Sequence, residues 1–460
     1  MIVFVISLMA FVSKAQVFDV DTLQFNGADD KFINLVIMGD GYQASEFNKL
    51  IADANDFTSA LFNKAPFTQY QSYFNVFLIK TPSNESGADH AGTATDVPEP
   101  QHATGFFDTY FDAQFDSFGF HRSLTVNNVT AMDVLADNVP AYDQAIMLVN
   151  TPFYGGSGGE IPVASTEQFG KEIAIHEIGH SFVGLKDEYW AGDIFAGEAI
   201  NMTQDNDPLT VKWKNWDGDN GVGIFQHCCG GNASQWYKPH QFCIMQTLTY
   251  PFCSVCAEGI VETIHTMVDP VESFVPDNGM TIMPGSFPVD FALDLILPNP
   301  NTLKTNWTLN GNAYAADVDM VSVAENELDI GTNVLHVNVR DETSLLRVDN
   351  HATLHFTTVN WTIEYGTLGI EDITASEHTY ELQLYPNPAN DLLNILVESE
   401  FQEDLNVALY SLDGKQLKTA IGAMKKLLTI DISDLAPGTY VLNIRSAHGN
   451  VFSRKIMKKG

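Results

Sequence analysis

The chain has 460 residues, of which 45% are apolar, and a formal net charge of −35. A chain of this length is expected to form about three domains, and its acidity argues against a nucleic-acid partner because phosphate binding depends on Lys and Arg. No run of roughly 18 apolar residues occurs beyond the N-terminus, so we predict a globular protein without a transmembrane segment.

The N-terminus carries the pattern of a secretory signal. Residues 2–12 are an apolar run that is too short to cross a bilayer, and residues 13–15 (Ser-Lys-Ala) form a small-x-small cleavage site. We therefore predict a signal peptide over residues 1–15 and export of the mature chain. A buried N-terminal strand is the alternative.

Strands and helices alternate in the first part of the mature chain. Apolar runs predict strands at 32–38, 74–79 and 145–149, with a short strand near 161–164. Ser45 can cap a helix whose apolar face is spaced at helical intervals as far as Leu61. This alternation is typical of an α+β or α/β domain.

A glycine-rich turn at 155–159 follows the third of these strands. We predict that it lies at the edge of the sheet, where an extended peptide could add as a further strand with its scissile bond over a metal ion.

The segment from His176 to His180 (His-Glu-Ile-Gly-His) carries the chemistry. Ser165 and Gln168 have capping-box spacing, which predicts a helix through the segment. On a helix both imidazoles lie on one face, one turn apart, and can bind one Zn²⁺ ion. Glu177 can then take a proton from the zinc-bound water and pass it to the leaving amine.

The third zinc ligand is expected just after this helix. Gly184 can end the helix and turn the chain back, so that Asp187 and Glu188 approach the ion. Because Gly184 to Asp187 resembles the Gly-x-x-ligand turn of metzincin peptidases, we favour Asp187 as the ligand and expect Glu188 to orient an imidazole N–H. Tyr189 is a candidate second donor to the oxyanion.

All five cysteines lie in one short segment: Cys228, Cys229, Cys243, Cys253 and Cys256. In an exported protein this clustering favours two local disulfides and one remaining thiol. The alternative is a structural metal site built on Cys253 and Cys256, with His227 or Cys243. Met245 lies downstream of the helix, where metzincins place a methionine turn beneath the metal.

Beyond about residue 268 the period of the apolar pattern changes to two. Leu303 to Leu309 alternate before the turn Asn310-Gly311, and Leu335 to Val339 alternate with polar residues. We predict an Ig-like β-sandwich over 268–370. A polar linker then leads to a smaller β domain over 379–460.

The signature from His176 to Tyr189 resembles that of the IgA-type peptidase family M64. The resemblance extends to residues 39–42, 85–89, 243–245 and 252–256, and so covers about residues 20–265. It implies a zinc peptidase with His176 and His180 as ligands and Glu177 as the catalytic acid/base. Cleavage of immunoglobulin A is not implied.

The C-terminal segment resembles the sorting domain of the type IX secretion system of Bacteroidetes. The resemblance rests on residues 384–388, 438–441 and 455–459. From Lys415 onward, nine Lys/Arg and two Asp give a net charge of +7, which leaves −42 on the rest. This charge break indicates a separate module, and the resemblance implies handling by the type IX secretion machinery and a secreted or cell-surface location.

Together these features predict three domains: an α+β, metzincin-like catalytic domain with a mixed sheet and an active-site helix over 16–267, the β-sandwich and the sorting domain. The predicted activity is zinc-dependent hydrolysis of peptide bonds in extracellular proteins, with polypeptides as substrates. Two alternatives stay open. One is a non-catalytic surface binding protein stabilised by zinc, and the other is a zinc amide hydrolase that acts on a non-protein substrate.

Overall fold

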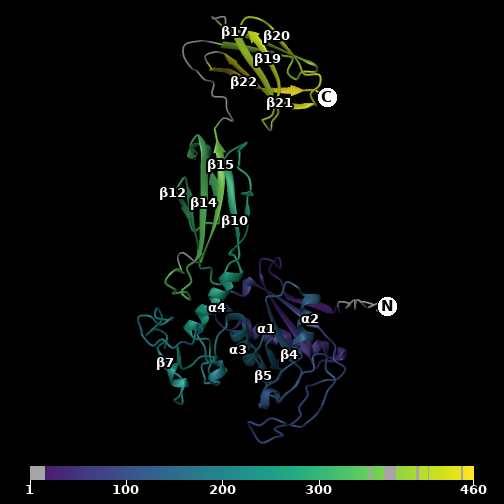
Figure 1. Cartoon of the computed structure of the whole chain (residues 1–460), viewed down its shortest axis with the longest axis vertical. Helices are drawn as coiled ribbons and strands as arrows, with labels where there is room; N and C mark the ends of the chain where they lie inside the picture. Colours follow the sequence, from purple (N-terminus) through teal and green to yellow (C-terminus); the bar gives the residue numbers. More distant parts are fainter. Residues whose placement is uncertain are drawn as a thin grey trace, which may run out of the picture. The chain divides into compact units, whose positions relative to one another are not determined.

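The computed structural model describes residues 16–351, 355–366, 380–399, 404–412, 414–446 and 449–459. The predicted signal peptide, residues 1–15, lies outside the described residues. The described chain is β-rich, with several sheets and few helices (Figure 1).

A mixed six-stranded sheet forms the centre of the N-terminal part, in the order β1-β3-β2-β4-β6-β5. The inner strands β3, β2, β4 and β6 run parallel, whereas β1 and β5 are antiparallel to their neighbours. The strands span Asp19–Gln24 (β1), Ile33–Asp40 (β2), Phe74–Lys80 (β3), Gln144–Val149 (β4), Gly156–Ser157 (β5) and Val163–Ser165 (β6). Every residue of β2 and β4 is buried, as expected for strands covered on both faces.

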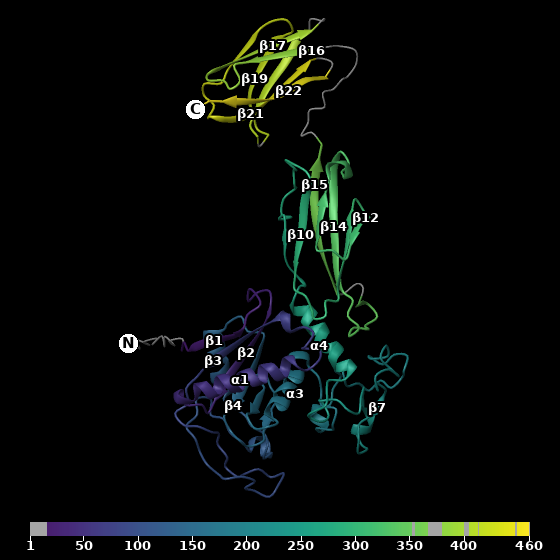
Figure 2. The same ribbon diagram turned by 180° about the vertical axis from the view of Figure 1, so that it is seen from behind.

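Helices cover both faces of this sheet. The helices span Phe47–Phe62 (α1), Asn128–Asn138 (α2), Gly170–Val183 (α3) and Ser254–Met267 (α4). One hydrophobic core joins α1, α3 and α4 to one face, and a second joins α2 to the other face. Figure 2 shows α1 crossing in front of the strands, with α3 beside it.

Two predicted helix starts were wrong. Ser45 lies inside a 3-10 turn (Ala44–Glu46) that precedes α1, and Gln43 begins that turn. Ser165 ends β6 instead of capping α3, because its hydroxyl accepts a hydrogen bond from the N–H of Gly155 at 3.3 Å. Helix α3 begins later, at Gly170, where a Cβ would lie 1.8 Å from the carbonyl of Ser165. The strand and the helix therefore meet too closely for any other residue.

The segment between α3 and α4 is largely irregular, with two short paired strands, Phe225–Gln226 (β7) and Tyr237–Lys238 (β8). After α4, two antiparallel sheets follow, in the orders β13-β10-β9 and β12-β11-β14-β15. Their strands span Val271–Val275 (β9), Val289–Leu295 (β10), Leu303–Leu309 (β11), Asn312–Ala316 (β12), Met320–Val323 (β13), Gly331–Asp341 (β14) and Phe356–Tyr365 (β15).

The alternating pattern in this region is confirmed. Trp307 is opposite Val337 in the β11–β14 ladder, and both are buried. The ring of Trp361 on β15 stacks on Trp307 at 5.8 Å and contacts Phe291 of the other sheet at 5.2 Å. Asn310 and Gly311 have φ of 53° and 77°, as the predicted hairpin turn requires.

Two further antiparallel sheets lie in the C-terminal region, in the orders β16-β17-β20 and β19-β18-β21-β22. They are built from Tyr380–Tyr385 (β16), Leu392–Ser399 (β17), Asp404–Tyr410 (β18), Gln416–Ala423 (β19), Leu428–Asp431 (β20), Gly438–Ser446 (β21) and Gly449–Lys458 (β22). Apolar side chains from both sheets form a common core.

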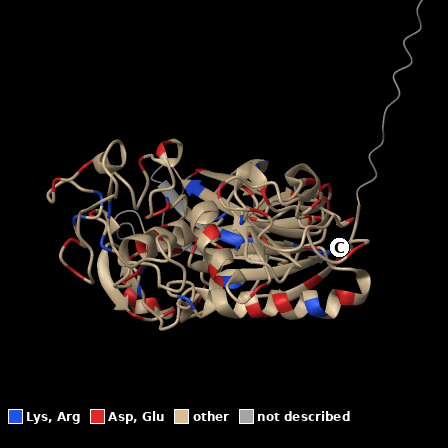
Figure 3. Cartoon of the chain, turned by 90° about the horizontal axis from the view of Figure 1, so that it is seen from below, with Lys and Arg blue, Asp and Glu red and all other residues tan. Residues whose placement is uncertain are grey.

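The chain divides into two compact units: Met1–Met280, Ser286–Val323 and Val334–Thr362 form the first, and Thr281–Gly285, Ala324–Asn333 and Ile363–Gly460 the second. The predicted domain boundaries at 267 and 370 stay predictions. Among the described residues, none of the helices is both long and apolar enough to cross a bilayer. Figure 3 shows Asp and Glu at many places along the ribbon, in keeping with the net charge.

Candidate metal centre and active site

Helix α3 carries His176, Glu177 and His180. The Nδ1–H of His176 donates to the carbonyl of Ile244 at 2.9 Å, and that of His180 to the carbonyl of Leu185 at 2.7 Å. Because each proton lies on Nδ1, each Nε2 presents a lone pair, and the two Nε2 atoms lie 3.2 Å apart. The sequence prediction that one helix face would bring the two imidazoles together is confirmed.

The turn after α3 brings Asp187 back to this pair. Gly184 ends the helix with φ of 76°, and its N–H bonds to the carbonyl of His180, an αL cap that favours glycine. Asp187 Oδ1 then lies 3.2 Å from His176 Nε2 and 3.3 Å from His180 Nε2.

These three atoms fit a tetrahedral cation. Ligand atoms held ~2.0–2.1 Å from such an ion lie about 3.3–3.4 Å apart, close to the three separations observed here. Asp187 Oδ1 is buried and has no hydrogen-bond partner, which is costly unless a cation or proton satisfies it. The residues therefore could hold a metal ion, with one position left for water.

The charges of the three groups depend on one another. Burial alone would raise the pKa of Asp187, but the imidazoles of His176 and His180 next to its carboxylate hold that pKa well below its ordinary value. Burial would lower the pKa of His180, yet Asp187 raises it to about 9.

Glu177 lies beside the cluster without belonging to it. Burial raises its pKa, and the charges of His176 and His180 act in the opposite direction. A Cβ added to Gly158, next to β5, would lie 2.9 Å from Glu177 Oε2. The backbone of Gly158 therefore lies against the Glu177 carboxylate and forms one wall of the site.

The predicted role of Glu188 was wrong. Both imidazole N–H groups bond to backbone carbonyls, so no carboxylate is needed to orient them. Glu188 is fully buried on the other side of the turn, where Oε1 lies 3.3 Å from Cys256 Sγ and 4.0 Å from Cys253 Sγ. The carboxylate of Glu188 thus faces the thiols, whereas that of Asp187 faces the imidazoles.

The cysteine prediction was also wrong. One disulfide joins the neighbours Cys228 and Cys229, and the other three thiols are free and buried. Cys243 Sγ and Cys256 Sγ lie 3.7 Å apart, much further than the ~2.05 Å of a bond. Ligand atoms of Glu188, Cys243, Cys253 and Cys256 lie within 4.8 Å of one another. Four such groups could hold a structural metal ion, as in the alternative with Cys243; His227 is not among them.

Met245 packs beneath the active-site helix. It is fully buried, and a Cβ on Gly179 would lie 2.8 Å from its sulfur. Ile244, the residue before it, supplies the carbonyl that fixes the tautomer of His176. The Met245 segment therefore packs against the helix that carries His176 and His180, as expected from the sequence.

The predicted free edge at the glycine-rich turn is partly covered. The N–H of Gly156 donates to the carbonyl of Arg122 at 3.1 Å, and its carbonyl accepts from Leu124 at 3.4 Å. The outward backbone groups of Gly156 are thus already paired, so a peptide strand cannot add there. The uncovered part of this edge begins at Gly158, which is exposed.

Two groups near this site, Arg122 and Tyr154, were not predicted from the sequence. Arg122 is exposed, and its positive charge acts to lower the pKa of Glu177. Burial chiefly raises the pKa of Tyr154, and the charge of Arg122 acts against that rise. Tyr189, which was predicted, has a pKa raised by burial and then by the charge of Asp187. Arg122 lies in a loop without periodicity, far in sequence from α3, which begins at Gly170, so no local pattern could have identified it.

Residues 22–221 match the family model described as IgA Peptidase M64. The resemblance to the M64 peptidases is confirmed. The match contains the whole cluster from His176 to Asp187 but ends before the cysteine-rich segment, which the predicted extent to 265 included. The match to this family supports a peptidase activity.

Residues 383–459 match the model of a secretion system C-terminal sorting domain. A sorting domain of the type IX system indicates export and a cell-surface or secreted location. With the M64 match, it indicates an exported peptidase.

Similar solved structures share little sequence with the chain. Latent PorU from Porphyromonas gingivalis is 11% identical, over 41% of this chain and 20% of that one, with a TM-score of 0.16. The fibronectin(III)-like modules of Clostridium thermocellum CbhA are 8% identical, over 41% and 92%, with a TM-score of 0.16. The chain thus spans about a fifth of the length of latent PorU. No curated protein matches the chain.

Proposed function

We propose that the chain is an exported zinc-dependent endopeptidase that hydrolyses peptide bonds of extracellular proteins. His176, His180 and Asp187 are the zinc ligands, and Glu177 is the general base and acid. The observation that carries the proposal is the convergence of two imidazole nitrogens and one unpaired carboxylate oxygen, 3.2–3.3 Å apart, beside a second carboxylate, that of Glu177. The match to a peptidase family over the same residues supports it.

The choice of zinc follows from the ligand set. Two imidazoles and one carboxylate suit Zn²⁺ in tetrahedral geometry, and three protein ligands leave the open position of a catalytic site. Zn²⁺ held there would polarise the scissile carbonyl and make a water molecule acidic enough to attack it near neutral pH. The carbonyls of Ile244 and Leu185 would hold the imidazoles in place through their N–H groups.

Glu177 would move the proton in each half of the reaction. Its pKa is raised by burial, which brings it closer to the operating pH and makes proton uptake from water and return to the leaving amine easier. Tyr189 would donate a hydrogen bond to the oxyanion, since a phenol is protonated near neutral pH and its raised pKa leaves it so. The substrate would lie along the uncovered edge from Gly158 onward, next to Glu177.

The domain division belongs to this proposal. A metzincin-like α+β catalytic domain over 16–267 would be followed by an Ig-like β-sandwich over 268–370 and a sorting domain over 379–460, itself a small β-sandwich. The aromatic contacts between the sheets of the middle region and the shared core of the C-terminal sheets support this.

The test compares cleavage of a peptide library by the zinc-loaded wild-type chain and its Glu177→Ala variant, with zinc content measured for both. We expect cleavage by the wild type alone and zinc in both proteins. A surface binding protein stabilised by zinc would hold zinc and cleave nothing. A zinc hydrolase of non-protein amides would leave peptides intact but hydrolyse small amides in a Glu177-dependent way.

A further inference from the structure

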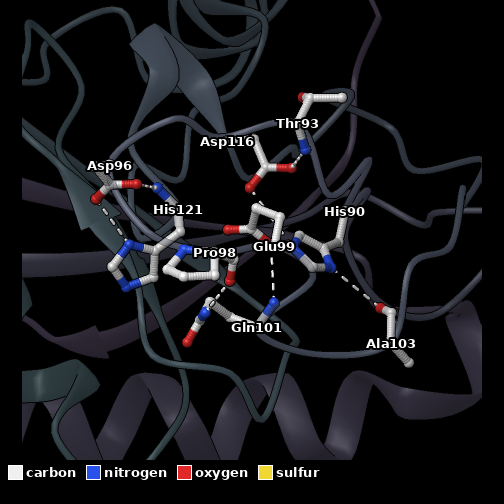
Figure 4. Close-up of polar contacts among 9 residues, drawn as sticks. All are labelled: His90, Thr93, Asp96, Pro98, Glu99, Gln101, Ala103, Asp116 and His121. Atoms are coloured by element: carbon white, nitrogen blue, oxygen red, sulfur yellow. Dashed lines mark hydrogen bonds and ion pairs between the residues drawn. The ribbon is translucent and has the colours of Figure 1, made fainter.

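A second cluster of ligand-type side chains lies in the long loop between β3 and α2. His90, Glu99 and Asp116 converge there (Figure 4). His90 Nε2 lies 3.4 Å from Glu99 Oε2 and 3.5 Å from Asp116 Oδ1, and the three side chains are only 2%, 7% and 2% exposed. This cluster shares no residue with the proposed active site.

Hydrogen bonds to the surrounding backbone hold these side chains in place and leave one nitrogen or oxygen atom of each without a partner. His90 Nδ1 donates to the carbonyl of Ala103 at 3.2 Å, so Nε2 presents a lone pair. The N–H of Thr93 donates to Asp116 Oδ2 at 2.9 Å. The N–H of Gln101 donates to Glu99 Oε2, the oxygen next to His90, at 2.8 Å. His90 Nε2, Glu99 Oε1 and Asp116 Oδ1 are buried and have no hydrogen-bond partner. His90 Nε2 and Asp116 Oδ1 thus face one another at 3.5 Å, next to a second carboxylate, which is costly in a buried place unless a cation lies among them.

An imidazolium ion fits this geometry less well than a metal. Charge-assisted N–H···O bonds have lengths of about 2.7–2.9 Å, whereas the two separations here are 3.4 and 3.5 Å. Ligands of a tetrahedral ion at ~2.0–2.1 Å lie about 3.3–3.4 Å apart. The geometry points to a bound metal ion, and we propose that His90, Glu99 and Asp116 form a second zinc site. Mg²⁺ and Ca²⁺ are less suitable because they prefer oxygen ligands alone.

The position of the loop gives this site a structural role. Between β3 and α2, the structure has isolated bridges and one 3-10 turn, Ser117–Gly119. Ser117, next to Asp116, donates its N–H to the carbonyl of Ser123 at 3.3 Å. Arg122 and Leu124, on either side of Ser123, form backbone hydrogen bonds with Gly156 of β5. A cation that fixes Asp116 therefore also fixes the segment that holds the edge strand beside Glu177.

The first test is the metal content of the full chain, measured for the wild type, His90→Ala and Glu99→Gln. We expect each variant to lose about one zinc ion per chain. His121→Ala is the matched control, because His121 lies in the same loop but pairs with Asp96 at 2.8 Å, and it should keep the wild-type content. Equal content in the wild type and both variants would overturn the proposal, and is also the result expected of an imidazolium without metal.

A second measurement does not depend on whether the loop variants fold. In the His176→Ala/His180→Ala chain, a chelator should increase deuterium uptake in residues 88–118, and added zinc should restore protection. Unchanged uptake in that segment would contradict a metal site there. The proposed peptidase activity can fail or succeed independently, because neither measurement uses it.

Discussion

The two histidine-carboxylate clusters of this chain have nearly the same inner geometry and different surroundings. In both, a Nδ1–H bonds to a backbone carbonyl and frees Nε2, and the facing atoms lie 3.2–3.5 Å apart. The cluster at α3 includes a side chain that is 22% exposed, that of His180, and has Glu177 beside it. The loop cluster is 2–7% exposed. The shared ligand geometry supports the proposal of a metal ion in both clusters. Access to solvent and the neighbouring carboxylate of Glu177 support the proposal of catalysis at the α3 cluster alone.

The largest effect is expected at Glu177. Glu177→Gln keeps the size of the side chain and removes the base, so peptide cleavage should fall by about 10²–10⁴-fold. The metal content should not change at either cluster. Asp133→Asn, at an exposed acidic residue of α2, should cleave like the wild type. Full activity of Glu177→Gln in a steady-state assay would contradict the proposal that Glu177 makes the α3 cluster catalytic.

Variants of Asp187 and Glu188 distinguish the proposed zinc ligand from the residue next to it. Asp187→Asn removes the charged ligand atom, and we expect the zinc concentration needed to restore activity to rise by at least about 10²-fold. Glu188→Gln should need the same concentration as the wild type, since Glu188 faces the thiols. A zinc titration of metal-depleted protein measures both. The reverse order of the two variants would show that Glu188 is the ligand.

A buried carboxylate that is fully paired provides the reference for both clusters. Asp341 accepts hydrogen bonds from Tyr70, Thr302 and His265 at 2.6, 2.5 and 3.0 Å. Burial opposes ionisation, but these donors lower its pKa. Because its pKa is lowered in the folded state, the ionised carboxylate stabilises the fold at pH values above its unfolded-state pKa of about 3.9. This stabilisation is lost as the pH falls from that value through the lower pKa of the folded state.

Asp341→Asn should therefore lower the free energy of unfolding at pH 7 by about 2–4 kcal/mol, and by less near pH 3. Denaturant unfolding at the two pH values measures this. The metal content should stay that of the wild type, because Asp341 has protein donors instead of a cation. A loss of metal, or a larger effect at low pH, would contradict this assignment.

The smallest effect is expected at the packing beneath the first cluster. Gly179→Ala places a methyl group 2.8 Å from the sulfur of Met245, and overpacking of this kind costs about 1–3 kcal/mol. Gly285→Ala, where a Cβ meets nothing within 4 Å, should be close to neutral. Thermal unfolding compares the two. If Gly179→Ala is as stable as Gly285→Ala, the contact does not constrain the helix.

The local patterns of the sequence predicted local structure well. Helical spacing brought His176 and His180 together, Gly184 turned the chain, and the period of two placed Trp307 and Val337 in one ladder. These features depend on residues that are close in sequence or on strict alternation. The order of the strands and the covering of Gly156 depend on contacts between distant segments, which no periodicity reveals.

Part of the site could not be predicted for the same reason. His90, Glu99 and Asp116 are spaced irregularly in a loop, so the sequence gives no sign that their side chains meet. The direction of Glu188 depends on where Cys243, Cys253 and Cys256 lie in three dimensions. The signal peptide and the boundaries of the three domains remain predictions from the sequence.

The most direct test of the central claim is a crystal structure of the zinc-loaded full chain, with anomalous scattering recorded at the zinc edge. We predict an anomalous peak within ligand distance of His176 Nε2, His180 Nε2 and Asp187 Oδ1, with Glu177 next to it and outside the ligand set. An ion bound by Glu188 or Glu177 instead of Asp187, or no ion at this cluster in a protein that cleaves peptides, would contradict the account.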